Sequence, residues 1–311
     1  MGLFPRYDKE GPGVYADDPK KGPFVRFFQT YSNKFLKIMS INLMFVLFNI
    51  PSFVLAFFGV LYFLPQMNHV FEPTAFQQKL VEIGAIAADN TVAGESAAMQ
   101  LYLIVVMVIV MFVVGMQLVT VGPVQAGFSY IYRSYARETT TFLWSDFVSA
   151  FKNNWKQSTI VTVITLIVTG LMTLNIGFYG NTYTGQFAQI FSSLFFIAMI
   201  FYMCIQLYIY PLIASLDLKL RSIYRNAALF FLGRLIPTLG IFLADVAVLL
   251  IVPAVLLYSF SNAGVALVII YYLLFAFSFV HYLNTFFVWQ QIERYIVKPQ
   301  EDAGKSTETT A

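Results

Sequence analysis

Six long apolar runs, with Asp245 as their only charged residue, constrain this chain more than any other feature. A helix needs about 20 apolar residues to span a bilayer, because every backbone polar group inside the hydrocarbon must find its partner within the segment. Charged residues make up 11% of the chain, against about 25% in an ordinary soluble domain. The sequence therefore predicts an all-α, polytopic membrane protein with six transmembrane helices. The predicted spans are residues 39–64, 98–121, 158–178, 187–214, 236–259 and 264–288.

The Lys and Arg residues lie almost entirely on one side of this pattern. Eighteen of the nineteen fall in the N-terminal segment, the second and fourth connections or the C-terminal tail, and Lys79 is the exception. Because basic residues are retained on the cytoplasmic side, both termini are predicted to lie in the cytoplasm. The net charge of +3 thus reports topology. The expected partner is the lipid bilayer, with no reason to invoke nucleic acid.

The connections between the spans differ in size and character. We expect a cytoplasmic arm with an interfacial helix, an outer loop, a cytoplasmic loop with an amphipathic helix, a cytoplasmic amphipathic segment, and a cytoplasmic tail with a disordered end. In that order they cover residues 1–38, 65–97, 122–157, 215–235 and 289–311.

The three cytoplasmic segments share one spacing of apolar residues, which predicts an internal repeat. Each stripe occupies one face of a helix and is followed by a basic residue and a span, as suits the membrane interface. The unit predicted three times over is an interfacial helix followed by a two-span hairpin. The second and fourth spans also end alike, with Pro123 and Pro211 expected to kink or end their helices. The stripes are Phe24, Phe27, Phe28, Tyr31 and Phe35; Trp144, Phe147, Val148, Phe151 and Trp155; and Leu220, Ile223, Tyr224, Ala227 and Phe231.

Four polar residues inside the spans are candidate functional residues. A carboxylate at the depth of Asp245 costs about 2.5–3.5 kcal/mol to insert, so it should face the bundle interior or water. It could couple protons or cations, or it could join two helices through a hydrogen bond. His281 lies at comparable depth and could pair with Asp245, as a proton relay or as a structural contact. Gln117 and Gln206 could join helices or line a solute path.

Five polar residues on the predicted cytoplasmic side are candidates for docking a partner or contacting lipid, with a solvated face as the plain alternative. They are Arg133, Lys152, Asn153, Lys156 and Arg225.

Metal and enzyme chemistry find no support in the sequence. Cys204 is the only cysteine and His69 the only other histidine, so no metal-ligand cluster and no cofactor are expected. The chain carries no nucleophile elbow, phosphate-binding loop or His-Glu-x-x-His motif, and we expect no enzyme.

A set of short motifs is spread over most of residues 1–235. The motifs are Gly122-Pro123-Val124-Gln125-Ala126-Gly127, Tyr132-Arg133, Asp146-Phe147, Phe151-Lys152-Asn153-Asn154, Lys156-Gln157-Ser158, Gly2-Leu3-Phe4, Gly11-Pro12, Asn42, Pro51, Tyr210-Pro211-Leu212 and Asn226-Ala227-Ala228. Together they resemble the YesL-like membrane proteins, the family of domain of unknown function 624.

This resemblance implies a small integral protein of the bacterial cytoplasmic membrane, of a family often encoded beside carbohydrate uptake systems and glycan-degrading enzymes. The family supplies no established activity and no site residues. The leading expectation is a non-catalytic accessory or scaffold protein, with a carbohydrate importer subunit as partner. The alternative is a proton- or cation-coupled secondary transporter, for which six spans are few, so that a homo-oligomer could be required. The outer loop 65–97 is longer than in the shorter members.

Overall fold

The computed structural model describes residues 22–86, 92–182 and 185–299, and these residues form helices and connections without a strand. Six helical segments are long and apolar enough to cross a membrane, which confirms the all-α class and the predicted number of spans. The first 21 residues and the tail from residue 300, including its predicted disordered end, lie outside the described residues. The six segments are Ile50–Met67, Gly94–Gly115, Leu143–Asn181, Gln186–Ser215, Leu235–Phe260 and Ala263–Val297.

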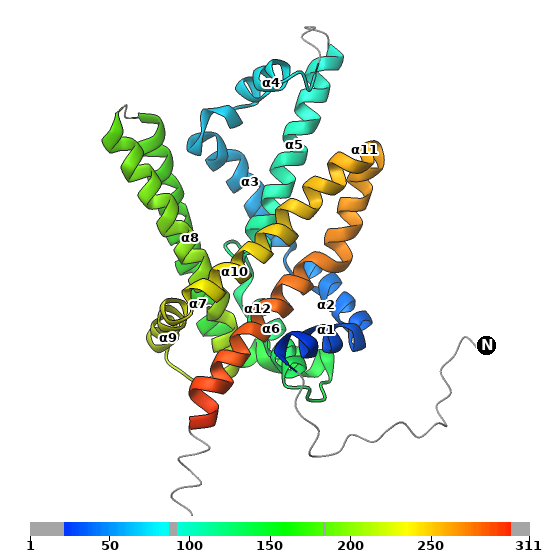
Figure 1. Ribbon diagram of the computed structural model, residues 1–311, viewed down its shortest axis with the longest axis vertical. Helices are drawn as coiled ribbons and strands as arrows, with labels where there is room; N and C mark the ends of the chain where they lie inside the picture. Colours follow the sequence, from blue (N-terminus) through cyan, green and yellow to red (C-terminus); the bar gives the residue numbers. More distant parts are fainter. Residues whose placement is uncertain (1–21, 87–91, 183–184, 300–311) are drawn as a thin grey trace, which may run out of the picture.

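The spans form three hairpins that converge at one end of the molecule and diverge at the other (Figure 1). The first comprises α3 (Ile50–Met67) and α5 (Val92–Gly115), linked by η1 (His69–Phe71) and α4 (Pro73–Glu82). The second comprises α7 (Leu143–Gly177), η2 (Phe178–Thr182) and α8 (Gln186–Ser215). The third comprises α10 (Leu235–Val246), η3 (Ala247–Ile251), α11 (Val252–Tyr271), η4 (Tyr272–Ala276), α12 (Phe277–Ile292) and η5 (Glu293–Val297).

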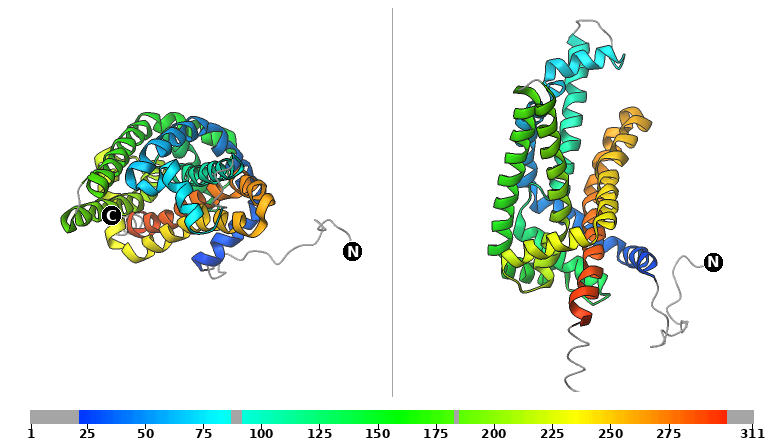
Figure 2. Two further views of the ribbon diagram at one scale, coloured as in Figure 1. Left: turned by 90° about the horizontal axis from the view of Figure 1, so that it is seen from above. Right: turned by 60° about the vertical axis from the view of Figure 1, so that its left-hand side comes forward.

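Three further helices gather where the hairpins converge: α1 (Pro23–Asn33), α6 (Gly122–Ala136) and α9 (Leu220–Gly233) (Figure 1). We call this the basic end, since these helices and their flanks carry most of the described Lys and Arg residues. Helix α1 lies across the bundle rather than along the hairpins (Figure 2). It docks through Phe27, whose ring centroid lies 5.0 Å from that of Tyr282, while Phe24 stays exposed.

Helix α6 is the core of the basic end. Twelve of its 15 residues are buried, and it contacts α7, α8 and α12. Gly122 permits the close approach to α7, because a methyl group there would overlap the Ser158 carbonyl oxygen. At Gly127 the added carbon would lie 2.7 Å from the Phe147 ring. The sequence predicted one amphipathic helix in 122–157 and missed α6.

Helix α7 corrects the second predicted interfacial helix. The stripe 144–155 and the span 158–178 were expected to be separate, but α7 is continuous over 35 residues. At about 1.5 Å per residue it is about 52 Å long, well beyond a hydrocarbon core of about 30 Å. No Pro or Gly interrupts the sequence from Leu143 to Thr169, so nothing ends the helix at the interface. The predicted threefold repeat therefore does not hold in its second unit, although α1 and α9 are separate helices.

The positions of the prolines explain the outcome of two other predictions, which concern the first span and the ends of the second and fourth spans. The predicted first span, 39–64, is divided at Asn49 into α2 (Phe35–Phe48) and α3, because Pro51 has no N–H to continue the helical ladder. Only α3 is long enough to count as a span. Pro123 lies in the first turn of α6, after a break, whereas α8 continues through Pro211 to Ser215.

Candidate functional site

Two of the four polar residues predicted within the spans, Gln117 and Asp245, lie where a helix ends or is interrupted. Helix α5 ends at Gly115, and Gln117 then adopts φ 60°. The amide of Leu118 donates to the Val113 carbonyl at 3.0 Å, which is the bond of a left-handed helix C-terminus. His281 Nε2 lies 3.0 Å from the Gly115 carbonyl oxygen and donates to it. That leaves His281 Nδ1, 3.4 Å from Gln117 Nε2, as the acceptor for the glutamine amide.

Asp245 is fully buried, and its partner is Asn284. Asn284 Nδ2 donates to Asp245 Oδ2 at 3.0 Å, while Asp245 Oδ1 has no hydrogen-bond partner among the described residues. Asp245 and His281, which the sequence analysis considered as a possible pair, form no hydrogen bond with each other and have different partners. His281 and Asn284 lie about one turn apart on α12, and the end of α5 faces the first while α10 faces the second.

Gln206 joins the two helices of the second hairpin. Its Nε2 lies 2.5 Å from Thr165 Oγ1 on α7 and 2.6 Å from the Tyr202 hydroxyl on α8. A comparable cluster closes the break between α2 and α3. There Asn49 Oδ1 accepts from Thr120 Oγ1 at 3.1 Å and from Gln125 Nε2 at 3.3 Å. The Gln206 contacts therefore lie within the second hairpin, whereas the Asn49 contacts hold the start of α3 to the connection after α5 and to α6.

The third hairpin contains two helix interruptions that the sequence analysis missed. Pro253 cannot donate to the carbonyl of Leu249, four residues earlier, and the Tyr272 hydroxyl donates to that carbonyl at 2.5 Å. Asn42 donates to the carbonyls of Tyr272 at 2.7 Å and Leu273 at 2.6 Å in η4. Pro253 within a span was the one signal in the sequence that could have indicated such a site.

Two arginines at the basic end bind the C-termini of helices. Arg133 Nη1 donates to the Ala214 carbonyl of α8 at 2.5 Å, and Arg26 Nη2 donates to the Ala136 carbonyl of α6 at 3.2 Å. A cation there complements the partial negative charge of the helix end. Burial lowers the pKa of the Arg133 guanidinium, but an arginine remains protonated. Arg133, a predicted docking residue, is therefore engaged within the fold.

The other four predicted docking residues are exposed. Lys152, Asn153 and Lys156 lie on the third and fourth turns of α7, and Arg225 lies on α9. Gln157 Nε2 donates to the Leu218 carbonyl at 2.8 Å, which holds the start of α9 beside α7. The exposed cations of this region form no salt bridge within the described residues, and we call them the basic patch. The basic patch consists of Lys152, Lys156, Lys219, Arg221 and Arg225.

Six apolar helices, polar contacts at their interruptions and a basic end together define a multi-pass helical membrane protein. Residues 100–176, which run from α5 through α6 into α7, match the model of the family described as "Protein of unknown function, DUF624". The match confirms the family resemblance over this stretch, which contains Gly122, Gly127 and Arg133. Neither a curated protein nor a solved structure showed significant similarity to the chain.

Proposed function

We propose that this protein is a non-catalytic accessory or scaffold protein of a carbohydrate uptake system, which holds an importer subunit at the cytoplasmic face of a bacterial cell membrane. The observation that carries the proposal is the basic patch. Its cations are exposed, form no salt bridge within the described residues, and lie at the end that the positive-inside rule assigns to the cytoplasm. The setting of carbohydrate uptake comes from the resemblance to YesL-like proteins.

The buried polar residues support a structural use of the membrane-embedded part. His281 binds the carbonyl at the end of α5, and Gln206 joins α7 to α8. Such contacts hold helices together at modest gain, about 0.6 kcal/mol each. A scaffold needs this rigidity, because its docking face must keep one shape.

Affinity capture tests the proposal directly. Tagged protein is extracted from its native membrane in a gentle detergent, and co-purified proteins are identified by mass spectrometry. We expect a carbohydrate importer subunit with the wild type and its loss with the double variant Lys152→Glu, Lys156→Glu, since charge reversal removes the attraction to an acidic partner surface.

The matched control is the double variant Arg294→Glu, Lys298→Glu. It makes the same change in charge at exposed positions near the same end, but on the segment that follows α12. Capture should survive in this control. Recovery of only further copies of the chain, or equal capture by both double variants, would contradict the proposal. Recovery of anionic lipid alone would assign the basic patch to the membrane surface.

The second candidate function is a proton- or cation-coupled secondary transporter, and one observation favours it. Asp245 is fully buried in the last turn of α10, shortly before the π-helical segment η3, and its Oδ1 has no partner among the described residues. Unpaired carboxylates and irregular helices at membrane depth are features of transport sites.

Proteoliposomes with an imposed pH gradient and a pH-sensitive dye inside distinguish the two functions. A transporter predicts proton movement that Asp245→Asn abolishes. A scaffold predicts no such movement, and it predicts that Asp245→Asn captures the partner as the wild type does, because the amide still accepts from Asn284. Size-exclusion profiles check that the variant folds.

A further inference from the structure

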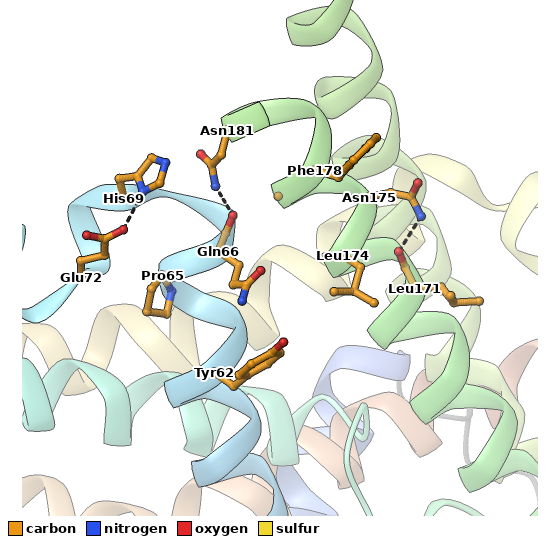
Figure 3. A pocket seen from close by; sticks show the side chains of 11 residues that line it. Tyr62, Pro65, Gln66, His69, Glu72, Leu171, Leu174, Asn175, Phe178 and Asn181 are labelled. Carbon is orange, nitrogen blue, oxygen red and sulfur yellow. Dashed lines mark hydrogen bonds and ion pairs between the residues drawn. The ribbon is translucent and has the colours of Figure 1, made fainter. Parts of the chain in front are cut away.

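A pocket of about 620 Å³ opens at the end of the molecule opposite the basic end, between α3 and α7 (Figure 3). One wall is the end of α3 with η1 and the residue after it, and it contributes Tyr62, Gln66, His69 and Glu72. The other wall is the last turns of α7 with η2. Pockets of roughly 300–1,000 Å³ are the usual size of small-molecule sites. None of the residues that the sequence analysis singled out as site candidates lies in this pocket.

The two walls are fixed to each other at one edge. Asn181 Nδ2 donates a hydrogen bond to the Gln66 carbonyl oxygen (Figure 3). Gly177 allows α7 to approach this point, because an added Cβ would lie 2.5 Å from the same oxygen. The pocket is thus formed by the fold itself and needs no ligand to bring its walls together.

The polar lining provides no cation for an anionic ligand. None of the eleven lining residues in the described part of the chain is Lys or Arg, so nothing there neutralises an anion. The single carboxylate, Glu72, has its Oε1 2.6 Å from His69 Nδ1, so one of its two oxygens is already engaged within the fold. The amides of Gln66, Asn175 and Asn181 each carry both a donor and an acceptor. Asn175 uses its amino group on the Leu171 carbonyl at 2.7 Å, which leaves its own oxygen as an acceptor.

Apolar surface lies beside these polar groups. Tyr62 is 60% exposed, and Leu174 lies on the facing wall, which α7 provides (Figure 3). The ligand that matches this lining is neutral, carries several groups that both donate and accept, and has a C–H face that packs on an aromatic ring. A saturated ring that carries several hydroxyl groups meets all three requirements.

We propose that this pocket binds a glycosyl group, presented from outside either as a free mono- or disaccharide or as the headgroup of a glycolipid. Tyr62 packs on the sugar ring, while Glu72 and the amides bind its hydroxyls. A free saccharide and a glycolipid headgroup can both reach the pocket, because it opens at the outer end of the bundle beside the exposed side chain of Leu171. The site goes beyond the scaffold proposal, since it requires no cytoplasmic partner.

The test uses the full-length protein in a detergent without a sugar headgroup. Saturation-transfer NMR measures binding of glucose and maltose, and native mass spectrometry measures retention of a glucosyl diacylglycerol from phosphatidylglycerol nanodiscs. We expect saturable binding of one of these probes, weakened roughly tenfold by Tyr62→Ala and by Glu72→Gln. Binding of the sugars identifies a free saccharide as the ligand, and retention of the glycolipid alone identifies a headgroup.

Two matched controls lie at the same end but outside the pocket. Tyr258→Ala removes a tyrosine that is 93% exposed on α11, and Glu82→Gln removes an exposed carboxylate of α4. Both should bind as the wild type does. The proposal is overturned if no probe binds saturably, if Tyr62→Ala and Glu72→Gln bind as the wild type does, or if glucose 6-phosphate binds more tightly than glucose. Partner capture with Tyr62→Ala, measured in parallel, keeps this result separate from the scaffold proposal.

Discussion

Gln117 adopts φ 60°, in a region of backbone space that residues with a side chain seldom occupy. Glycine would fit this position after a helix without strain. The glutamine side chain instead lies against His281, whose ring also binds the Gly115 carbonyl oxygen. The strained backbone is therefore retained together with a side-chain contact that glycine cannot make.

We expect Gln117→Gly to be more stable than Gln117→Ala by about 1 kcal/mol. Both variants lose the contact with His281, but only alanine is strained in the left-handed conformation that this position requires. Thermal unfolding of the purified variants, followed by tryptophan fluorescence, measures the difference.

Ser40 provides the control for this pair, because it is exposed within α2. There the order should reverse, with Ser40→Ala more stable than Ser40→Gly, as at any ordinary helical position. The same order at both positions would show that Gln117 is not held in the left-handed region.

At the residue scale, the sequence predicts which polar residues are buried within the helix bundle better than it predicts which residues they contact. Asp245, His281, Gln117 and Gln206 were expected inside the spans, and all four are buried. The pairing of Asp245 with Asn284 was not predicted, because it depends on the rotation and register of α10 against α12. The hydropathy pattern carries no information on the rotation of a helix or on its register against a neighbour.

Helix packing at the basic end depends on small residues of the α6–α7 contact, of which Gly122 makes the closest approach. Gly122→Ala should lower the free energy of unfolding by about 1–3 kcal/mol, because the new methyl group would overlap the backbone oxygen of Ser158. Gly170→Ala is the matched control, since an added Cβ there meets no heavy atom within 4 Å. It should be neutral or slightly stabilising. Equal thermal stability of the two variants would show that α6 does not pack on α7 in this way.

The interruption at Pro253 makes a second prediction for an element. Tyr272→Phe removes the hydroxyl that pairs with the Leu249 carbonyl, and leaving that buried oxygen unpaired should cost about 1–3 kcal/mol. Pro253→Ala returns an N–H to the helix and should recover part of this loss in the double variant. Thermal unfolding of the wild type, both single variants and the double variant gives the coupling energy.

Tyr258→Phe is the control for the lost hydroxyl, because Tyr258 is 93% exposed. It should leave the melting temperature unchanged. Additive effects of Tyr272→Phe and Pro253→Ala would mean that the hydroxyl does not serve the carbonyl freed by the proline.

At the element scale the apolar runs predict the number of spans but not every helix. Helix α6 was missed because it is neither an apolar run nor a one-sided stripe: it is buried around most of its circumference and carries Ser129 and Arg133. Helix α7 was divided in two because the change from an amphipathic to an apolar pattern near Ser158 resembles a boundary. The backbone continues through such a change unless Pro or Gly interrupts it.

For the whole molecule, the basic end is predicted to face the cytoplasm. Cys204 is the only cysteine and is fully buried, so the wild type should react poorly with a membrane-impermeant maleimide. Lys79→Cys should label in intact cells, because Lys79 lies on α4 at the opposite end. Lys152→Cys should label only after the cells are permeabilised. Labelling of Lys152→Cys in intact cells would invert the assigned topology.

Helix α6 lies between the second and third spans in the sequence, yet α7, α8 and α12 all pack against it. A ribosome that has delivered α6 has made none of these three helices. The part of the apolar surface of α6 that α12 covers must therefore remain exposed until almost the whole chain has been translated. A nascent chain that stops before α12 would leave one face of α6 open, and such exposed apolar surface promotes aggregation and degradation of incomplete chains.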